Sequence, residues 1–188
     1  MALLGAAGAC GRTAVDPPRA PVTATQRLLA QARAEERARR YDSARALYER
    51  AAREAPDRAS AAPAWRALAR ALLFWGEIGD AEAALERAVD SAPGEASAWH
   101  DLGIVRARRG HPAGAERALR RAIALAPREP RPRVALAALL VNQRRWPDAL
   151  DQYRALQRLP LPGRTRDAVA RAIELIETES RRRPRPGR

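Results

Sequence analysis

The sequence of 188 residues contains no lysine, a single cysteine and only two histidines. These few nucleophilic and ligating side chains form no metal-ligand cluster in the sequence. A glycine-rich phosphate loop and a nucleophile elbow are also missing. We therefore expect a protein that is not an enzyme and that uses no cofactor and no metal.

Aromatic residues are scarce as well, at 4% of the chain, although 46% of the residues are hydrophobic. The core must therefore be built largely from alanine and leucine. No stretch is long and apolar enough to span a membrane. The length suits one domain of about 140 residues with tails.

The charge of the chain is strongly one-sided. All 35 basic residues are arginine, against 22 acidic residues, which gives a formal net charge of +13. Arginine binds carboxylates and phosphates through two parallel hydrogen bonds, so this composition could serve recognition of such groups. It could equally reflect a GC-rich genome, which also enriches alanine, glycine and proline. In either case the surplus charge raises the encounter rate with acidic partners.

A 34-residue pattern recurs in the middle of the chain, and self-similarity at this period is typical of stacked helical hairpins. Small residues at two of its places let the helices of a hairpin approach closely. Proline near its end stops the second helix. The recurring pairs are Trp65 and Trp99, Leu68 and Leu102, Ala69 and Gly103, Gly76 and Gly110, Ala81 and Ala115, Leu85 and Leu119, Ala88 and Ala122, and Pro93 and Pro127.

This pattern resembles the tetratricopeptide repeat family. The resemblance implies an all-α protein, an α-solenoid of about four helical hairpins plus a C-terminal capping helix, that acts as a binding scaffold. We expect the solenoid over residues 25–163, with repeats at about 25–58, 62–95, 96–129 and 130–163. An amphipathic stretch predicts the capping helix over 164–181, with Thr165 as its N-cap. About three additional residues at 58–61 are expected to lengthen the connection between the first two repeats.

The resemblance also indicates where a partner would bind. In this family, certain places of each first helix face a concave groove. The chaperone-binding members hold a carboxylate there with lysines and asparagines, a set that this chain lacks. What remains is a groove suited to an acidic, extended peptide, unless its arginines serve only solubility. The groove residues are expected to be Arg33, Arg37, Arg66, Arg70, Phe74, His100, Ile104, Arg108, Arg131, Val134 and Asn142.

One of these groove residues, His100, has an acidic neighbour in the sequence. Asp101 follows it directly and so points about 100° away around a helix. We therefore do not expect the two side chains to form an acid–base pair.

The N-terminus carries a second resemblance. Small residues precede the solitary Cys10, as in the cleavage box of a bacterial lipoprotein signal peptide, whose cysteine becomes acylated. Ala7 stands where leucine is usual, and no basic residue precedes the apolar run; a start codon further upstream would supply one. The resemblance implies that residues 1–10 are a signal ending at the lipidated cysteine and that 11–24 form a proline-rich tether. The protein would then sit in the cell envelope, lipid-anchored to the membrane and facing the periplasm.

Two other functions remain open. A soluble cytoplasmic adaptor would use the same groove without an anchor. Nucleic-acid binding would use the arginine surface and the basic tail at 182–188, but stacking aromatics spaced along a basic face are missing, because Trp65 and Trp99 belong to the repeat pattern. We therefore expect protein or peptide partners rather than nucleic acid.

Overall fold

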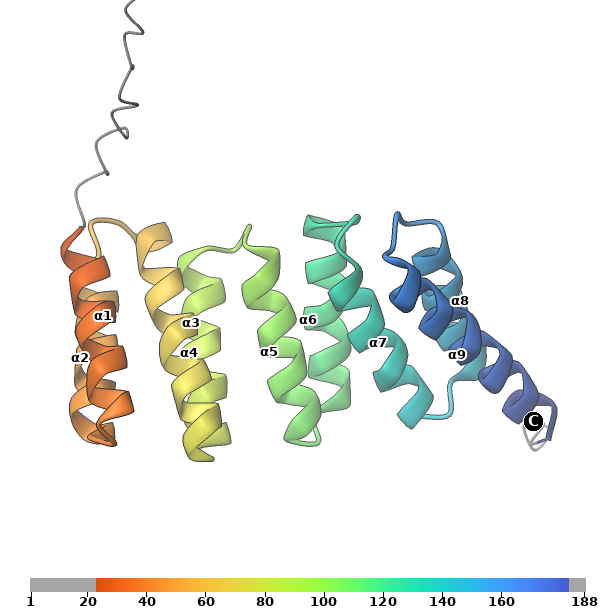
Figure 1. The fold of residues 1–188 in the computed structure, drawn as a ribbon, viewed down its shortest axis with the longest axis horizontal. Helices are drawn as coiled ribbons and strands as arrows, with labels where there is room; N and C mark the ends of the chain where they lie inside the picture. The colour runs from red at the N-terminus through yellow and green to blue at the C-terminus, as the bar shows by residue number, and fades with distance from the viewer. Residues whose placement is uncertain (1–22, 183–188) are drawn as a thin grey trace, which may run out of the picture.

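The structure, a computed structural model, describes residues 23–182. This part of the chain contains nine α-helices and no β-strand, so the all-α expectation is confirmed (Figure 1). Their bounds are α1 Ala24–Arg37, α2 Tyr41–Arg53, α3 Arg58–Trp75, α4 Ile78–Ser91, α5 Ala96–Arg108, α6 Pro112–Leu125, α7 Pro130–Asn142, α8 Trp146–Gln157 and α9 Gly163–Arg182.

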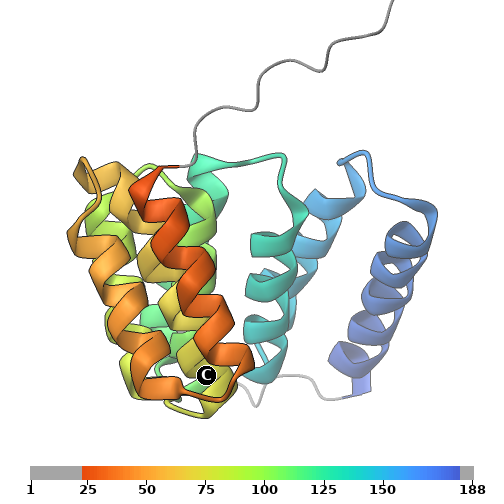
Figure 2. The same cartoon turned by 60° about the vertical axis from the view of Figure 1, so that its left-hand side comes forward.

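The first eight helices form four hairpins that stand side by side in a row. Figure 1 shows α1, α3, α5 and α7, the first helix of each hairpin, nearer the viewer than their partners. Each second helix also packs against the first helix of the next hairpin, which joins the hairpins into one solenoid. Figure 2 shows α9 at the opposite end of the row from α1.

Alanine and leucine build the core, as the composition predicts. Leu72, Leu85, Leu102 and Leu119 are all less than 2% exposed and belong to the buried core clusters of the solenoid. At the crossing of α5 and α6 the backbones are so close that a Cβ on Gly103 would lie 2.6 Å from the Leu119 Cγ atom. Small residues at this place therefore do permit the close approach.

The turn inside each hairpin uses the left-handed backbone conformation once. Within residues 23–182, the residues with positive φ are Arg39, Gly76, Gly110 and Arg144, with φ of 60°, 88°, 75° and 57°. They occupy the same place in the four hairpins. Glycine adopts this conformation without strain, whereas arginine does so at a cost of about 1 kcal/mol.

The connection between the first two hairpins differs from the prediction. Residues 58–61 do not lengthen a loop, because α3 begins at Arg58 and has 18 residues, against 13 in α5. Asp57 caps this longer helix, since its carboxylate accepts a hydrogen bond of 2.8 Å from the Ser60 backbone N–H. The additional residues therefore add a turn to α3.

The last helix, α9, packs along α8 at the C-terminal end of the row. Val169 and Ile176 are buried in this contact, whereas Leu175 is 64% exposed. The prediction of Thr165 as N-cap is wrong: the helix begins at Gly163, and the Arg166 backbone N–H already donates to the Pro162 carbonyl oxygen at 2.9 Å.

An ion pair bridges every neighbouring pair of hairpins and the last hairpin to α9. At each of these junctions an arginine takes part, and its side chain is then not available to bind a partner. Examples are Arg45 to Asp80, Arg66 to Asp101, Arg106 to Glu82, Arg145 to Glu116 and Arg154 to Glu177.

Candidate binding groove

Four linked cavities follow the first helices of the hairpins. From the α1 end toward α7, their volumes are about 360, 430, 250 and 440 Å³. Phe74 lines the first and second cavities, and Arg70 lines the second and third. His100 and Arg131 line both the third and the fourth. Because adjacent cavities share lining residues, they form one groove, which we call the binding groove.

The structure brings most of the predicted site residues into this groove. Val134, Asn142 and Arg66 line none of the four cavities. The residues that do line them are Arg33, Arg37, Arg70, Phe74, His100, Ile104, Arg108 and Arg131.

The third cavity, between α3 and α5, concentrates positive charge over an apolar surface. Arg70, Arg108 and Arg131 come from three successive first helices and line it together with Leu73 and Ile104. Within residues 23–182, none of these three guanidinium groups has a carboxylate partner. Unpaired guanidinium groups that share one cavity produce a positive potential, so an anionic group is the ligand chemistry that this cavity favours.

Arg66, in contrast, is paired with two carboxylates. Its Nη2 and Nε atoms donate to Asp101 Oδ2 at 2.8 and 3.1 Å, and its Nη1 atom donates to Glu95. Burial lowers the pKa of Arg66, but the hydrogen bonds and negative charges of Asp101 and Glu95 together outweigh this effect, so the net pKa is raised. Arg66 therefore braces α3 against α5, which argues against its predicted role in binding a partner.

Contrary to expectation, the side chains of His100 and Asp101 are in contact. The distance between His100 Nδ1 and Asp101 Oδ1 is 3.2 Å. Adjacent residues start about 100° apart around a helix, but Arg66 draws the Asp101 carboxylate to the side of α5 that faces α3. This arrangement depends on the tertiary contact between the two hairpins. The sequence feature that could have indicated the pairing is that Asp101 lies one repeat length plus one residue after Arg66.

The contact with Asp101 orients the imidazole of His100. An ionised carboxylate can only accept hydrogen bonds, so Nδ1 must carry the proton, and Nε2 is the nitrogen left for a ligand. Burial raises the pKa of Asp101, but hydrogen bonds from His100 and Arg66 outweigh it and the net pKa lies below the usual value of 3.8. Asp101 is thus ionised near neutral pH and holds both neighbours in place.

Replacing Asp101 by asparagine is expected to lower the free energy of unfolding by about 1–2 kcal/mol at pH 7, because Arg66 loses one of its two charged partners. The pKa of Asp101 is lowered in the folded chain, so its contribution is present above pH 3.8 and is lost as the pH falls through the folded value. Urea unfolding of both chains at pH 7 and at a series of pH values below 3.8 measures this. A difference in unfolding free energy that did not shrink as the pH falls would contradict this assignment.

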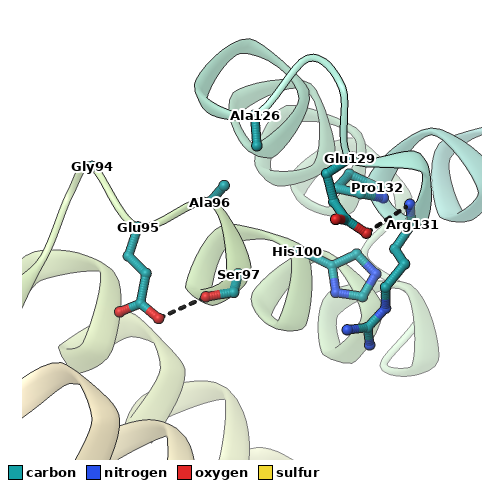
Figure 3. A pocket seen from close by; sticks show the side chains of 9 residues that line it. All are labelled: Gly94, Glu95, Ala96, Ser97, His100, Ala126, Glu129, Arg131 and Pro132. Carbon is teal, nitrogen blue, oxygen red and sulfur yellow. Dashed lines mark hydrogen bonds between the residues drawn. The ribbon is translucent and has the colours of Figure 1, made fainter. Parts of the chain in front are cut away.

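The fourth cavity lies between the N-terminal ends of α5 and α7 (Figure 3). Figure 3 shows the side chain of Arg131 beside the His100 ring. Two carboxylates also line this cavity: Glu95 accepts from Ser97 Oγ at 2.6 Å, and Glu129 accepts from the Arg131 backbone N–H at 3.4 Å. This end of the groove is therefore less positive than the third cavity.

The described residues show no arrangement that points to catalysis. They contain no group of three or more histidine, cysteine, aspartate or glutamate side chains that could hold a metal ion. Ser97 lies one helical turn before His100, but its hydroxyl donates to Glu95 instead of to the imidazole. Ser97 therefore does not extend the contact between His100 and Asp101 into a chain of hydrogen bonds.

Two tryptophans of the repeat pattern are used in packing. Trp65 is 8% exposed, and the guanidinium of Arg87 lies 4.8 Å from the centre of its ring. Trp99 donates from Nε1 to the Pro93 carbonyl oxygen at 2.9 Å. Trp65 belongs to the buried core, and Trp99 is partly buried against it.

The N-terminal and C-terminal predictions fall largely outside the described residues. These include Cys10, the signal over 1–10, almost all of the tether and the basic tail from 183 on. Within residues 23–182, none of the helices has the length and apolar character needed to cross a membrane.

Sequence comparison gives one consistent result. The tetratricopeptide repeat pattern matches residues 36–103 and again residues 100–161, so together the matches span 36–161 of the 188 residues. No curated protein matches the sequence.

Several solved structures share the fold, all at low sequence identity. YrrB, described as a TPR protein with an unusual peptide-binding site, has a TM-score of 0.64 and 18% identity over 84% of this chain and 78% of its own. MamA has a TM-score of 0.64 and 17% identity over 87% and 96%. The Yersinia enterocolitica type III secretion chaperone SycD, in complex with a peptide of the translocator YopD, has a TM-score of 0.57 and 18% identity over 62% and 92%.

Proposed function

Because the chain belongs to the tetratricopeptide repeat family, we propose that it is a non-enzymatic protein-interaction scaffold whose groove binds an extended, acidic segment of a partner protein. The scaffold role is supported by the fold and by two similar structures, one described as having a peptide-binding site and one in complex with a peptide. The acidic character of the partner is our proposal from the charge of the groove.

One observation carries the proposal. Six arginines that line the groove have no carboxylate partner within residues 23–182: Arg33, Arg37, Arg39, Arg70, Arg108 and Arg131. Elsewhere in the solenoid, many arginines are paired across hairpins, which shows that acidic partners are available in the chain. Positive charge left unpaired along a concave surface favours association with an acidic ligand.

The proposal is tested with synthetic peptides and fluorescence anisotropy. A labelled nine-residue acidic peptide is expected to bind the full chain, and a peptide of the same length with glutamine and asparagine in place of its acids is not. Affinity should fall steeply between 0.1 and 1 M salt, because the Debye length shrinks from about 10 to about 3 Å. Equal affinity for the two peptides, or affinity independent of salt, would contradict the proposal.

We further propose that the scaffold is anchored in the bacterial cell envelope by acylation of Cys10, where it would hold partner proteins in an assembly. The support is the small-residue segment before the single cysteine and the proline-rich stretch after it. The soluble cytoplasmic adaptor is the alternative.

Replacing Cys10 by alanine tests the anchor. In a bacterial host, with any upstream residues of the gene included, the wild type is expected in the membrane fraction and labelled by radioactive palmitate. The Cys10→Ala variant should be soluble and unlabelled, because it lacks the acceptor thiol. Unlabelled wild-type protein in the cytoplasm would favour the adaptor.

A further inference from the structure

A large apolar side chain lies exposed at the α1 end of the binding groove. Phe74, the only phenylalanine of the chain, is 79% exposed near the C-terminal end of α3. It lines the first two cavities of the groove, of about 360 and 430 Å³. Packing within the solenoid does not account for this side chain, because its ring contributes so little to the core.

Two further aromatic residues support the surface around Phe74. Tyr41 lines the first cavity with it, and the rings of Tyr41 and Trp75 lie 5.0 Å apart with an interplanar angle of 43°. Trp75 follows Phe74 in α3 and packs against the buried core. The apolar surface therefore rests on side chains that are held by the fold, which suits a preformed contact site.

The charges around Phe74 are mostly positive and unpaired. Four arginines line the same two cavities, and within the part of the chain that the structure describes none has a carboxylate partner. The acidic residue lining them is Glu36, whose carboxylate accepts a hydrogen bond of 2.9 Å from the Tyr48 hydroxyl. The four arginines are Arg33, Arg37, Arg39 and Arg70.

We propose that this end of the groove is an anchor subsite for one bulky apolar side chain of the partner, flanked on both sides by acidic residues. The inference rests on the proposed function and specifies which acidic segment the groove would select. Exposed ion pairs alone contribute little and are screened by salt. An aromatic contact surrounded by charge adds affinity and fixes the register of the bound segment.

The neighbouring cavity sets the spacing in that segment. The first helices of adjacent hairpins are separated by about one helix diameter, roughly 10–12 Å, and an extended chain advances roughly 3.3–3.6 Å per residue. An acidic residue about three places from the apolar one therefore reaches the third cavity, where Arg108 lies. The partner segment thus has an aromatic or long aliphatic residue with acids next to it and about three residues away.

Two labelled nine-residue peptides and four forms of the full chain, the wild type and three variants, test this subsite. One peptide alternates glutamate and aspartate around a central phenylalanine, and the other has alanine at that centre and the same charge. We expect the wild type to bind the first about 10-fold more tightly than the second at 0.1 M salt. Phe74→Ala should remove that preference, while Leu175→Ala, which truncates the exposed leucine of α9, should retain it.

Phe74→Leu provides the internal check, since it keeps an apolar side chain and should keep most of the preference. The circular dichroism and melting temperature of all variants should match the wild type, because both truncated side chains are exposed. Equal affinity of the wild type for the two peptides, or an undiminished preference in Phe74→Ala, would overturn the anchor and leave the acidic groove standing. No binding of either peptide would overturn the proposed function as well.

Discussion

Reversing Arg70 and Arg108 to glutamate is expected to abolish binding of the acidic segment, with a loss of affinity of about 100-fold or more. Both guanidinium groups line the third cavity, and neither has a carboxylate partner within residues 23–182. The double substitution changes the charge of this cavity by four and sets like charges against the ligand, which costs several kcal/mol. Anisotropy with the acidic peptide, or capture of the native partner, measures the loss.

A charge-matched control separates the groove from the general surplus of positive charge. Arg117 and Arg121 are exposed on α6, and no ion pair involves them in the described part of the chain. Reversing both to glutamate changes the net charge of the chain by the same amount but should lower the affinity only about 2- to 3-fold through long-range attraction. Similar losses in the two double variants would show that net charge, and not the groove, determines binding.

Replacing Ala115 by leucine is expected to lower the free energy of unfolding by about 1–3 kcal/mol, because a larger side chain at a close helix crossing forces the backbones apart. Ala115 is fully buried, and its carbonyl oxygen would lie 3.3 Å from a Cβ placed on Gly103. The matched change Arg117→Leu, on the exposed face of the same helix, should have almost no effect. Urea denaturation measures both, and equal shifts of the midpoint would mean that the repeat register is misplaced.

The repeat period made most of the fold predictable. Small residues such as Ala69 and Ala81 recur at places that the structure buries, and Pro93 follows the end of α4 by two residues. Where the period is interrupted, the prediction failed: Asp57 and Ser60 form an N-cap that starts α3 early. At this place the capping hydrogen bond, and not the 34-residue period, determines where α3 begins. The residues that form this cap could be recognised in the sequence.

The candidate site was predictable in its positions but not in its pairings. The helical face that a residue occupies follows from the register, which is why Arg70, Arg108 and Arg131 share a cavity. Whether an arginine forms an ion pair depends on which aspartate and glutamate side chains of the neighbouring hairpin lie near it. Arg66 meets Asp101 only because the solenoid brings α3 near α5. The ion pair could therefore not be derived from the sequence of the repeat that contains Arg66.

The two uses of arginine explain how one residue type can serve both stability and binding in this chain. Arginines that bridge hairpins, such as Arg45 and Arg145, are held by carboxylates on the adjacent hairpin. Arginines along the groove lack such partners in the described residues and remain able to meet an acidic ligand. The distribution of carboxylates therefore decides which arginines remain available for the proposed binding.

Photo-cross-linking of a labelled acidic peptide to the full chain, followed by mass spectrometry, tests the location of the binding site most directly. The peptide carries a benzophenone group at its centre and is bound at 0.1 M salt before irradiation. We predict cross-links to groove-lining residues of α1, α3, α5 and α7, in the region of Phe74, Ile104 and Arg131. Cross-links confined to the basic residues 182–188 or to α2, α4, α6 and α8 would contradict the assignment of the groove as the binding surface.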